Sequence, residues 1–228
     1  WSSDVCSSDL NYFLPEWWKN VPVKDNKGNP IVNTIKTCPG FIEYYSKNSI
    51  TIPLWSSFIF IPGYDNNCSY EFANKNKEHL FIPQHRIMRG NKYLRHMEQF
   101  KLYCPWLINE KSGIDFLYVQ DFYNFKHTEN FIIPPGVLNF KYQHTTGIHF
   151  LSNPDSEQKN HKIQMEAGQP LVKIFPLSEK KIKLKNNFVD DIEYKKLQKK
   201  SERAFFSNNY NKIKKIEQEK ENKCPFGF

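Results

Sequence analysis

Between Ile50 and Lys185 the chain is a succession of short runs rich in β-branched and aromatic residues, with no helical pattern between them. Proline and glycine residues separate many of these runs. Runs of this length, separated by turn residues, are typical of antiparallel sheets. We therefore expect a mainly β domain, built as an antiparallel sandwich or barrel. The predicted strands are 50–55, 58–61, 79–82, 99–104, 114–119, 131–133, 138–143, 148–152, 162–166, 171–175 and 181–185.

Side-chain alternation supports this prediction most clearly in two regions. In 138–143 every second residue is apolar, and the residues 144–147 that follow are predicted to form a turn leading into the strand 148–152. The run 181–185 alternates lysine with apolar residues, and such lysines protect an exposed sheet edge. The composition agrees, because 19 Phe, 12 Tyr and 5 Trp make 16% of the chain aromatic, and large rings favour sheet surfaces.

Four segments are expected along the chain. Residues 1–10, WSSDVCSSDL, resemble a translated sequencing adapter and are interpreted as a non-native artefact. Residues 11–48 are predicted to be an irregular segment packed on the body, with a turn around Asp25 and Gly28. Residues 49–185 form the predicted β-rich domain. Residues 186–228 form a basic helical tail, since 173–228 hold 15 Lys/Arg against 8 Asp/Glu.

The tail carries a helix-start signal at Asp190, which is followed three residues later by Glu193 in a capping-box arrangement. Ser207 and the two asparagines after it are expected to interrupt the helix. Beyond them an apolar helical face is expected to pack on the body or on a partner. Its members are Phe206, Tyr210, Ile213 and Ile216.

Several classes of site lack support in the sequence. Apart from Cys6, the cysteines are spaced by 30, 36 and 120 residues, which matches no zinc-binding pattern and favours reduced, buried thiols. No stretch approaches the ~18 apolar residues that a membrane span requires, and no signal peptide is seen. No Walker loop, GxGxxG, GxSxG or HExxH motif is present. We expect a chain without membrane contact.

One motif suggests a metal centre. His127 and Glu129 have the His-x-acid spacing of the facial triad that binds non-haem iron, in which a distant strand supplies a second histidine. His161 is the candidate for that ligand, and His144 and His149 also lie downstream. Fe(II) is the cofactor under this hypothesis, whereas polar loop residues without a cofactor are the alternative.

Two further clusters carry polar chemistry. His144, Thr145 and His149 lie beside a predicted turn and are candidate ligand-binding residues at the mouth of a pocket. The alternative is that they satisfy a tight turn. Residues 85–96 combine basic and apolar side chains, which suits either phosphate contact or a solvated segment over the core.

The segment 166–171, Glu-Ala-Gly-Gln-Pro-Leu, resembles the glycine turn between strands of cupins and other double-stranded β-helix proteins. This resemblance implies a jelly-roll or cupin-like arrangement of the sheets. It implies no activity.

Several aromatic and proline motifs resemble a group of uncharacterised proteins of tailed bacteriophages and related aquatic viruses. They are Thr37-Cys38-Pro39-Gly40-Phe41, Ile52-Pro53-Leu54-Trp55, Cys104-Pro105-Trp106, Phe122-Tyr123-Asn124-Phe125 and Phe140-Lys141-Tyr142-Gln143-His144. The resemblance implies a viral origin, in the host cytoplasm or the virion. It supplies no site residue.

Three functions follow as hypotheses. The leading one is a non-enzymatic viral accessory or virion-associated β-domain that binds another viral protein or a second copy of itself. The second is a cupin-like non-haem iron enzyme that uses the HxE motif and a distal histidine. The third is a nucleic-acid-binding protein that acts through its basic tail.

Overall fold

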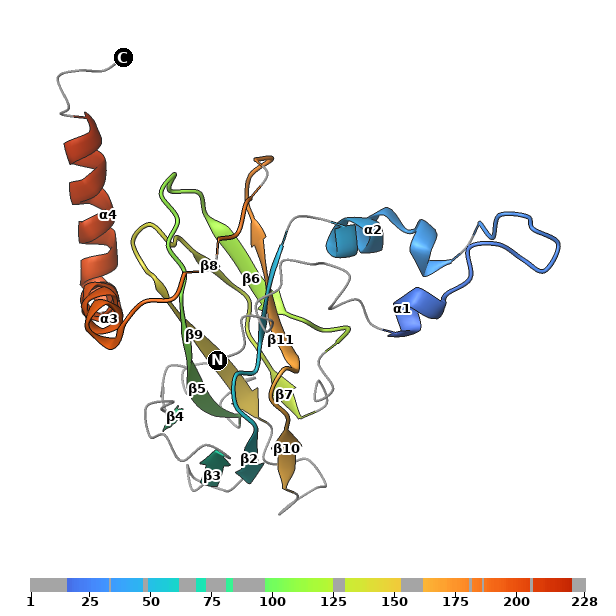
Figure 1. Ribbon diagram of the computed structural model, residues 1–228, viewed down its shortest axis with the longest axis horizontal. Coiled ribbons are helices and arrows are strands. Elements are labelled where there is room, and N and C mark those ends of the chain that lie inside the picture. Colours follow the sequence, from blue (N-terminus) through green and yellow to red (C-terminus); the bar gives the residue numbers. More distant parts are fainter. Residues whose placement is uncertain are drawn as a thin grey trace.

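The computed structural model describes residues 16–32, 34–46, 49–61, 69–72, 81–83, 97–124, 130–152, 162–180, 182–185, 187–205 and 207–222. These residues form mainly strands, arranged in three antiparallel sheets, which confirms the predicted mainly β sandwich (Figure 1). The strands are β1 (Ile50–Pro53), β2 (Phe58–Ile61), β3 (Ser69–Phe72), β4 (Phe81–Pro83), β5 (Glu98–Leu107), β6 (Phe116–Gln120), β7 (Phe131–Ile132), β8 (Gly136–Leu138), β9 (Thr145–Ser152), β10 (Ile163–Met165) and β11 (Pro170–Pro176).

The strand order mixes distant parts of the chain. One sheet runs β1-β11-β6-β8, a second β10-β2-β3 and a third β4-β5-β9-β7. β11 lies between β1 and β6, so the last strand holds the first one in place: Ile52 pairs with Val172 and Phe116 pairs with Pro176. The β5–β9 pair is the longest, and it extends from Glu98 opposite Ser152 to the end of β5.

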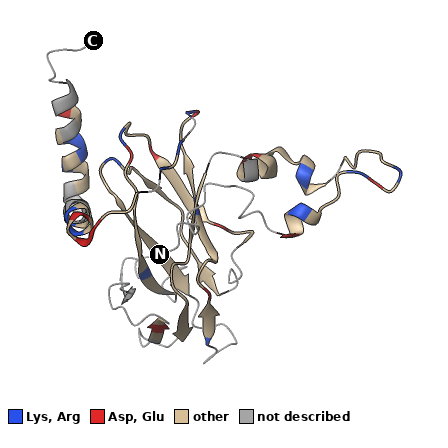
Figure 2. Ribbon diagram, viewed as in Figure 1, with Lys and Arg blue, Asp and Glu red and all other residues tan. Residues whose placement is uncertain are grey.

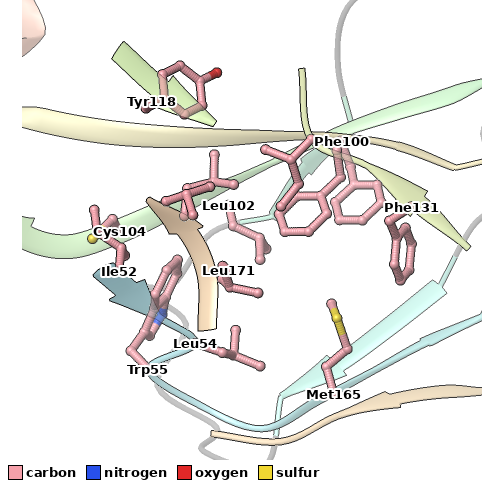
Figure 3. Close-up of a cluster of buried hydrophobic side chains, with 14 of the residues drawn as sticks. Ile52, Leu54, Trp55, Phe100, Leu102, Cys104, Tyr118, Phe131, Met165 and Leu171 are labelled. Atoms are coloured by element: carbon pink, nitrogen blue, oxygen red, sulfur yellow. The ribbon is translucent and has the colours of Figure 1, made fainter. Parts of the chain in front are cut away.

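The inner faces of the sheets share one apolar core, which is built largely from phenylalanine. Phe100 lies parallel to Phe150, with ring centroids 4.9 Å apart, and stacks on Phe60 at 4.7 Å. Phe131 meets these rings edge-on. Figure 3 shows Phe100 and Phe131 beside aliphatic side chains such as Leu102. Alternation along each strand therefore places one row of side chains in this core.

Most predicted strands are present, with four differences. β3 was not predicted, and residues 182–185 belong to none of the described strands although Ile182 packs against the core. The predicted strand 138–143 ends at Leu138 because Asn139 starts a turn: its carbonyl accepts from Tyr142 N and Gln143 N. The predicted turn 144–147 instead belongs largely to β9, which begins at Thr145.

Residues 16–46, here called the arm, extend away from one side of the sandwich (Figure 1). The arm contains α1 (Glu16–Asn20), the 3-10 helix η2 (Ile35–Thr37) and α2 (Pro39–Ser46), so its helices replace the irregular structure expected there. The predicted turn at Asp25 is confirmed. Asp25 Oδ1 accepts from the backbone N–H groups of Lys27 and Asn29, and Gly28 has φ +84°.

Residues 187–222, here called the tail, contain α3 (Asp191–Phe205) and α4 (Ser207–Asn222) on the other side of the sandwich (Figure 1). The predicted cap is confirmed, since Asp190 Oδ1 accepts from Glu193 N at 2.8 Å. Ser207 and the two asparagines after it, which were expected to interrupt the helix, instead form the first residues of α4, so that prediction is wrong. None of the helices in the described part of the chain combines the length and the apolar composition needed to cross a bilayer.

Candidate functional site

The predicted iron ligands His127, Glu129 and His161 lie outside the described residues, as does the basic segment 85–96. Within the described part of the chain, no three His, Cys, Asp or Glu side chains gather closely enough to hold a metal ion. The iron site therefore stays a prediction.

His144 and Thr145 lie at the start of β9, where both are buried. His144 Nδ1 is 3.1 Å from the carbonyl oxygen of Ile108, and Ile108 N donates to the His144 carbonyl at 2.8 Å. Thr145 pairs with Leu107 on β5. These contacts join the end of β5 to the beginning of β9. The two residues thus occupy a strand pairing and do not border the turn that the sequence suggested.

His149 points to the sheet face opposite the phenylalanine core, because its neighbour Phe150 points inward. It lies opposite Lys101 in the β5–β9 register, and its Nδ1 is 3.4 Å from Gln99 Nε2. Lys101 Nζ lies 4.8 Å from the centroid of the Tyr103 ring. The structure therefore separates His149 from His144 and places it in a polar row on the outer face of β5 and β9.

Lys101 is the most perturbed cation of this row. It is 5% exposed, and burial lowers the pKa of its ammonium group to about 8. Gly147 creates the space for this side chain, since a Cβ added there would overlap the Lys101 Cε. A lysine with such a pKa is partly neutral near physiological pH, and it could act as a base or a nucleophile if a substrate reached it.

A second polar cluster joins the arm to the sandwich, and sequence reasoning missed it. Tyr44 of α2 donates its hydroxyl to Asp121 Oδ1 at 3.3 Å, and Asn124 Nδ2 donates to Asp121 Oδ2 at 3.1 Å. Lys173 of β11 donates its Nζ to the Tyr44 carbonyl at 3.3 Å and lies 4.4 Å from the centroid of the Tyr44 ring. We call Tyr44, Asp121, Asn124 and Lys173 the anchor cluster.

Both charged groups of the anchor cluster are almost fully buried, and each has a shifted pKa. Burial raises the pKa of Asp121, against the hydrogen bond from Asn124 and the positive charge of Lys173, which lower it. Burial lowers the pKa of Lys173, against the negative charge of Asp121, which raises it. Desolvation is the largest cause of both pKa shifts, so each charged group depends on the other for part of its stabilisation.

Aromatic rings extend the anchor cluster. The Tyr44 ring contacts Phe175 and Tyr123 at centroid distances of 5.4 Å each. Tyr123 also meets Phe41 of α2 at 5.0 Å, and Trp17 Nε1 donates to its carbonyl at 3.3 Å. The arm therefore reaches the sandwich through polar and aromatic contacts that fix its base on β11 and on the segment after β6.

The three most exposed large apolar side chains of the described residues lie on the arm and on the tail, although Phe122, Val137 and Leu177 of the sandwich are also more than half exposed. On the arm, Val23 and Val32 are 52% and 77% exposed, and near the start of α3, Phe188 and Ile192 are 77% and 82% exposed. α4 also contacts the body, where its Tyr210 ring meets Tyr142 edge-on at 6.3 Å. That contact agrees with the apolar face predicted for α4, although Ile216 of the same face remains exposed.

Comparison of the chain with protein-family models, with curated proteins and with solved structures finds no match. The resemblance to bacteriophage proteins accordingly stays a prediction from the sequence motifs.

Proposed function

We propose that the chain is a non-enzymatic accessory or virion-associated β-domain of a virus, which contacts its partner through the arm and the tail. The observation that carries the proposal is the distribution of apolar side chains. Most of those of the strands fill one phenylalanine-rich core, whereas Val32, Phe188 and Ile192, the three most exposed large apolar side chains of the described residues, lie on the arm and on the tail. Exposed apolar groups of this size lower solubility unless a partner covers them.

The polar residues of the sandwich support a scaffold role. His144 holds a strand pairing, and Tyr44, Asp121 and Lys173 hold the base of the arm. The polar groups of these four residues form hydrogen bonds within the chain itself. A rigid sandwich that fixes two appendages in space is a suitable platform for assembling other chains.

Site-specific photo-crosslinking tests this proposal. Benzoylphenylalanine is introduced at position 32 on the arm, at 188 on the tail or, as the control, at the half-exposed Tyr70 on β3. In cells that produce the protein together with its partners, positions 32 and 188 should give adducts of discrete mass, and position 70 should give none. Equal labelling from all three positions, or none from 32 and 188, contradicts the proposal.

The iron-enzyme and nucleic-acid hypotheses lead to different results. A functional iron site requires near-stoichiometric metal in the purified protein, and His127→Ala should abolish its retention. Nucleic-acid binding by the tail requires an affinity that falls steeply with salt and is lost on truncation after Lys185.

A further inference from the structure

We infer that the partner of the arm is the tail of a second copy of this chain, so that copies join head to tail. This inference rests on the proposed function, because it identifies the occupant of the surfaces described there. The two surfaces are the arm surface, residues 17–36 around the exposed Val23 and Val32, and the tail surface, residues 188–194 around the exposed Phe188 and Ile192.

The two surfaces complement each other in charge. The arm surface contains four lysines and one aspartate; Lys19 forms an ion pair with Glu16, just outside this surface, and Lys24 and Lys27 are exposed. The carboxylate of that aspartate, Asp25, is occupied by backbone N–H groups of its own turn, which hold its pKa below the ordinary value. The tail surface contains three acidic residues and no basic residue. Each surface thus offers apolar side chains beside a net charge, which is positive on the arm surface and negative on the tail surface.

Charge also disfavours pairing each surface with itself. Two tail surfaces face to face would bring Asp190, Asp191 and Glu193 against the same residues, and two arm surfaces would oppose their lysines. Like charges across an interface are repulsive, whereas arm against tail brings opposite charges together. The charges therefore select a contact between two different surfaces.

The arrangement of the fold requires that this contact involve two chains. The arm and the tail lie on opposite sides of the sandwich and are separated along the longest dimension of the molecule (Figure 1). Charged residues are also numerous along the described parts of both extensions, whereas the strands between them contain few (Figure 2). Because the arm of one copy cannot reach its own tail, it can only meet that of another. Such contacts are heterologous, and they build rings or filaments.

A mixing experiment on the full chain tests the inference. The arm variant carries Val23→Ser and Val32→Ser, and the tail variant carries Phe188→Ser and Ile192→Ser. Sedimentation velocity of the unmodified chain should show species that grow beyond two copies as concentration rises into the high micromolar range. Each variant alone should stay monomeric, because losing two buried apolar side chains weakens association by about a hundredfold or more.

The equimolar mixture of the two variants distinguishes this geometry from others. The arm variant retains an intact tail and the tail variant an intact arm, so the mixture should form a species of two chains that does not grow further. A control with Ile132→Ser and Val137→Ser, exposed residues on the sandwich, should assemble like the unmodified chain. Circular dichroism and thermal melts establish that every variant is folded.

Charge reversal provides a second measurement that does not depend on the apolar substitutions. Asp191→Lys with Glu193→Lys, or Lys24→Glu with Lys27→Glu, should each weaken assembly by about tenfold. The four changes together in one chain should restore it.

Several results overturn the inference. The inference is wrong if the unmodified chain is monomeric, or if the arm variant or the tail variant assembles on its own. It is also wrong if the mixture of the two stays monomeric, or if combining the four charge reversals in one chain does not restore assembly. If the purified chain is monomeric while positions 32 and 188 still crosslink to a different protein, the head-to-tail contact is wrong and the proposed function stands. Absence of both self-association and crosslinks rejects both.

Discussion

Replacement of Lys173 by methionine measures how strongly the anchor cluster depends on its buried charges. Methionine fills a similar volume but removes the positive charge that lowers the pKa of Asp121, and it removes the donor to the Tyr44 carbonyl. Breaking a direct buried ion pair by deleting one partner costs about 3–5 kcal/mol, which is an upper bound for Lys173 and Asp121, whose interaction is electrostatic. Asp121 keeps hydrogen bonds from Tyr44 and Asn124. We therefore expect a loss of about 2–4 kcal/mol in the free energy of unfolding.

A double-mutant cycle separates the coupling from the two individual losses. Asp121→Asn alone should destabilise by about 1–3 kcal/mol, because an uncompensated lysine then remains buried. The double variant should lose about 1–2 kcal/mol less than the sum of the two single losses. The assay is guanidinium chloride unfolding at neutral pH, followed by tryptophan fluorescence.

The control pairs Asp121→Asn with Lys101→Met, which removes another buried lysine from a different sheet. Those two changes should add to within about 0.5 kcal/mol, since no contact joins them. If Lys173→Met and Asp121→Asn are equally additive, the argument that the two charges stabilise each other is refuted.

Three more predictions concern stability, each measured by chemical unfolding. Phe100→Leu should destabilise the protein by about 1–3 kcal/mol, because Phe100 contacts three aromatic rings of the core. The control Phe122→Leu, at an exposed position, should change the free energy of unfolding by less than about 0.5 kcal/mol. Similar losses for the two variants would contradict the packing argument. The pKa of Lys101, lowered to about 8, lies below the ~10.4 of an unfolded lysine, so its buried charge destabilises the fold below pH ~8. This penalty is about 1–2 kcal/mol after allowance for solvent screening, and it should decline as pH rises from about 8 to 10.5, so that the protein becomes more stable over this range. Lys101→Met should abolish this gain in stability. If the variant has the same pH profile as the unmodified protein, the lowered pKa is contradicted. Gly136→Ala should destabilise the protein by about 1–3 kcal/mol, because the new Cβ would overlap the ring of Tyr118, which pairs with Gly136 across β6 and β8. The control Gly40→Ala has open space around it and should be neutral or slightly stabilising. Equal effects would exclude the overlap as the cause.

The strands were predictable because burial imposes a period of two on the sequence. Phe58 and Phe60 point into the core while Ile59 and Ile61 point away, and the sequence shows this run between a serine pair and a proline. The α3 boundary was predictable for a similarly local reason, since one aspartate side chain caps the helix. Where neighbouring residues determine the structure, the sequence pattern is sufficient.

Local patterns were misleading where a single side chain changes the backbone direction. Leu138, Phe140 and Tyr142 alternate as in a strand, but Asn139 forms the turn, and its amide donates to Gly113 O and Asp115 Oδ1. Phe140 still reaches the core from this turn, so its burial imitates the strand period. The bond that decides the structure joins residues 24 positions apart, and no local pattern contains it.

The anchor cluster likewise depends on contacts between residues that are distant in the sequence. Its residues come from α2, from the segment after β6 and from β11, which meet only because β11 lies between β1 and β6. One signal was present in the sequence: Lys173 interrupts the apolar run 171–175, and a lysine in a buried strand requires a compensating group. The sequence could indicate that a partner exists, but only the strand order identifies it as Asp121 and Tyr44.

The anchor cluster also determines what the proposed head-to-tail contact can build. Whether a heterologous contact closes a ring or extends a filament depends on the rotation between successive copies. That rotation follows from the direction of the arm relative to the tail, because each copy is joined through both. The arm direction is fixed where Tyr44 meets Lys173 and Asp121, and where Trp17 and Phe41 meet Tyr123. Burying the charges of Asp121 and Lys173 reduces stability. Their directed interactions nevertheless hold the arm in one orientation, which a purely apolar contact would define less strictly. The cost of burying Asp121 and Lys173 is therefore understandable if the direction of the arm, rather than its attachment alone, determines assembly.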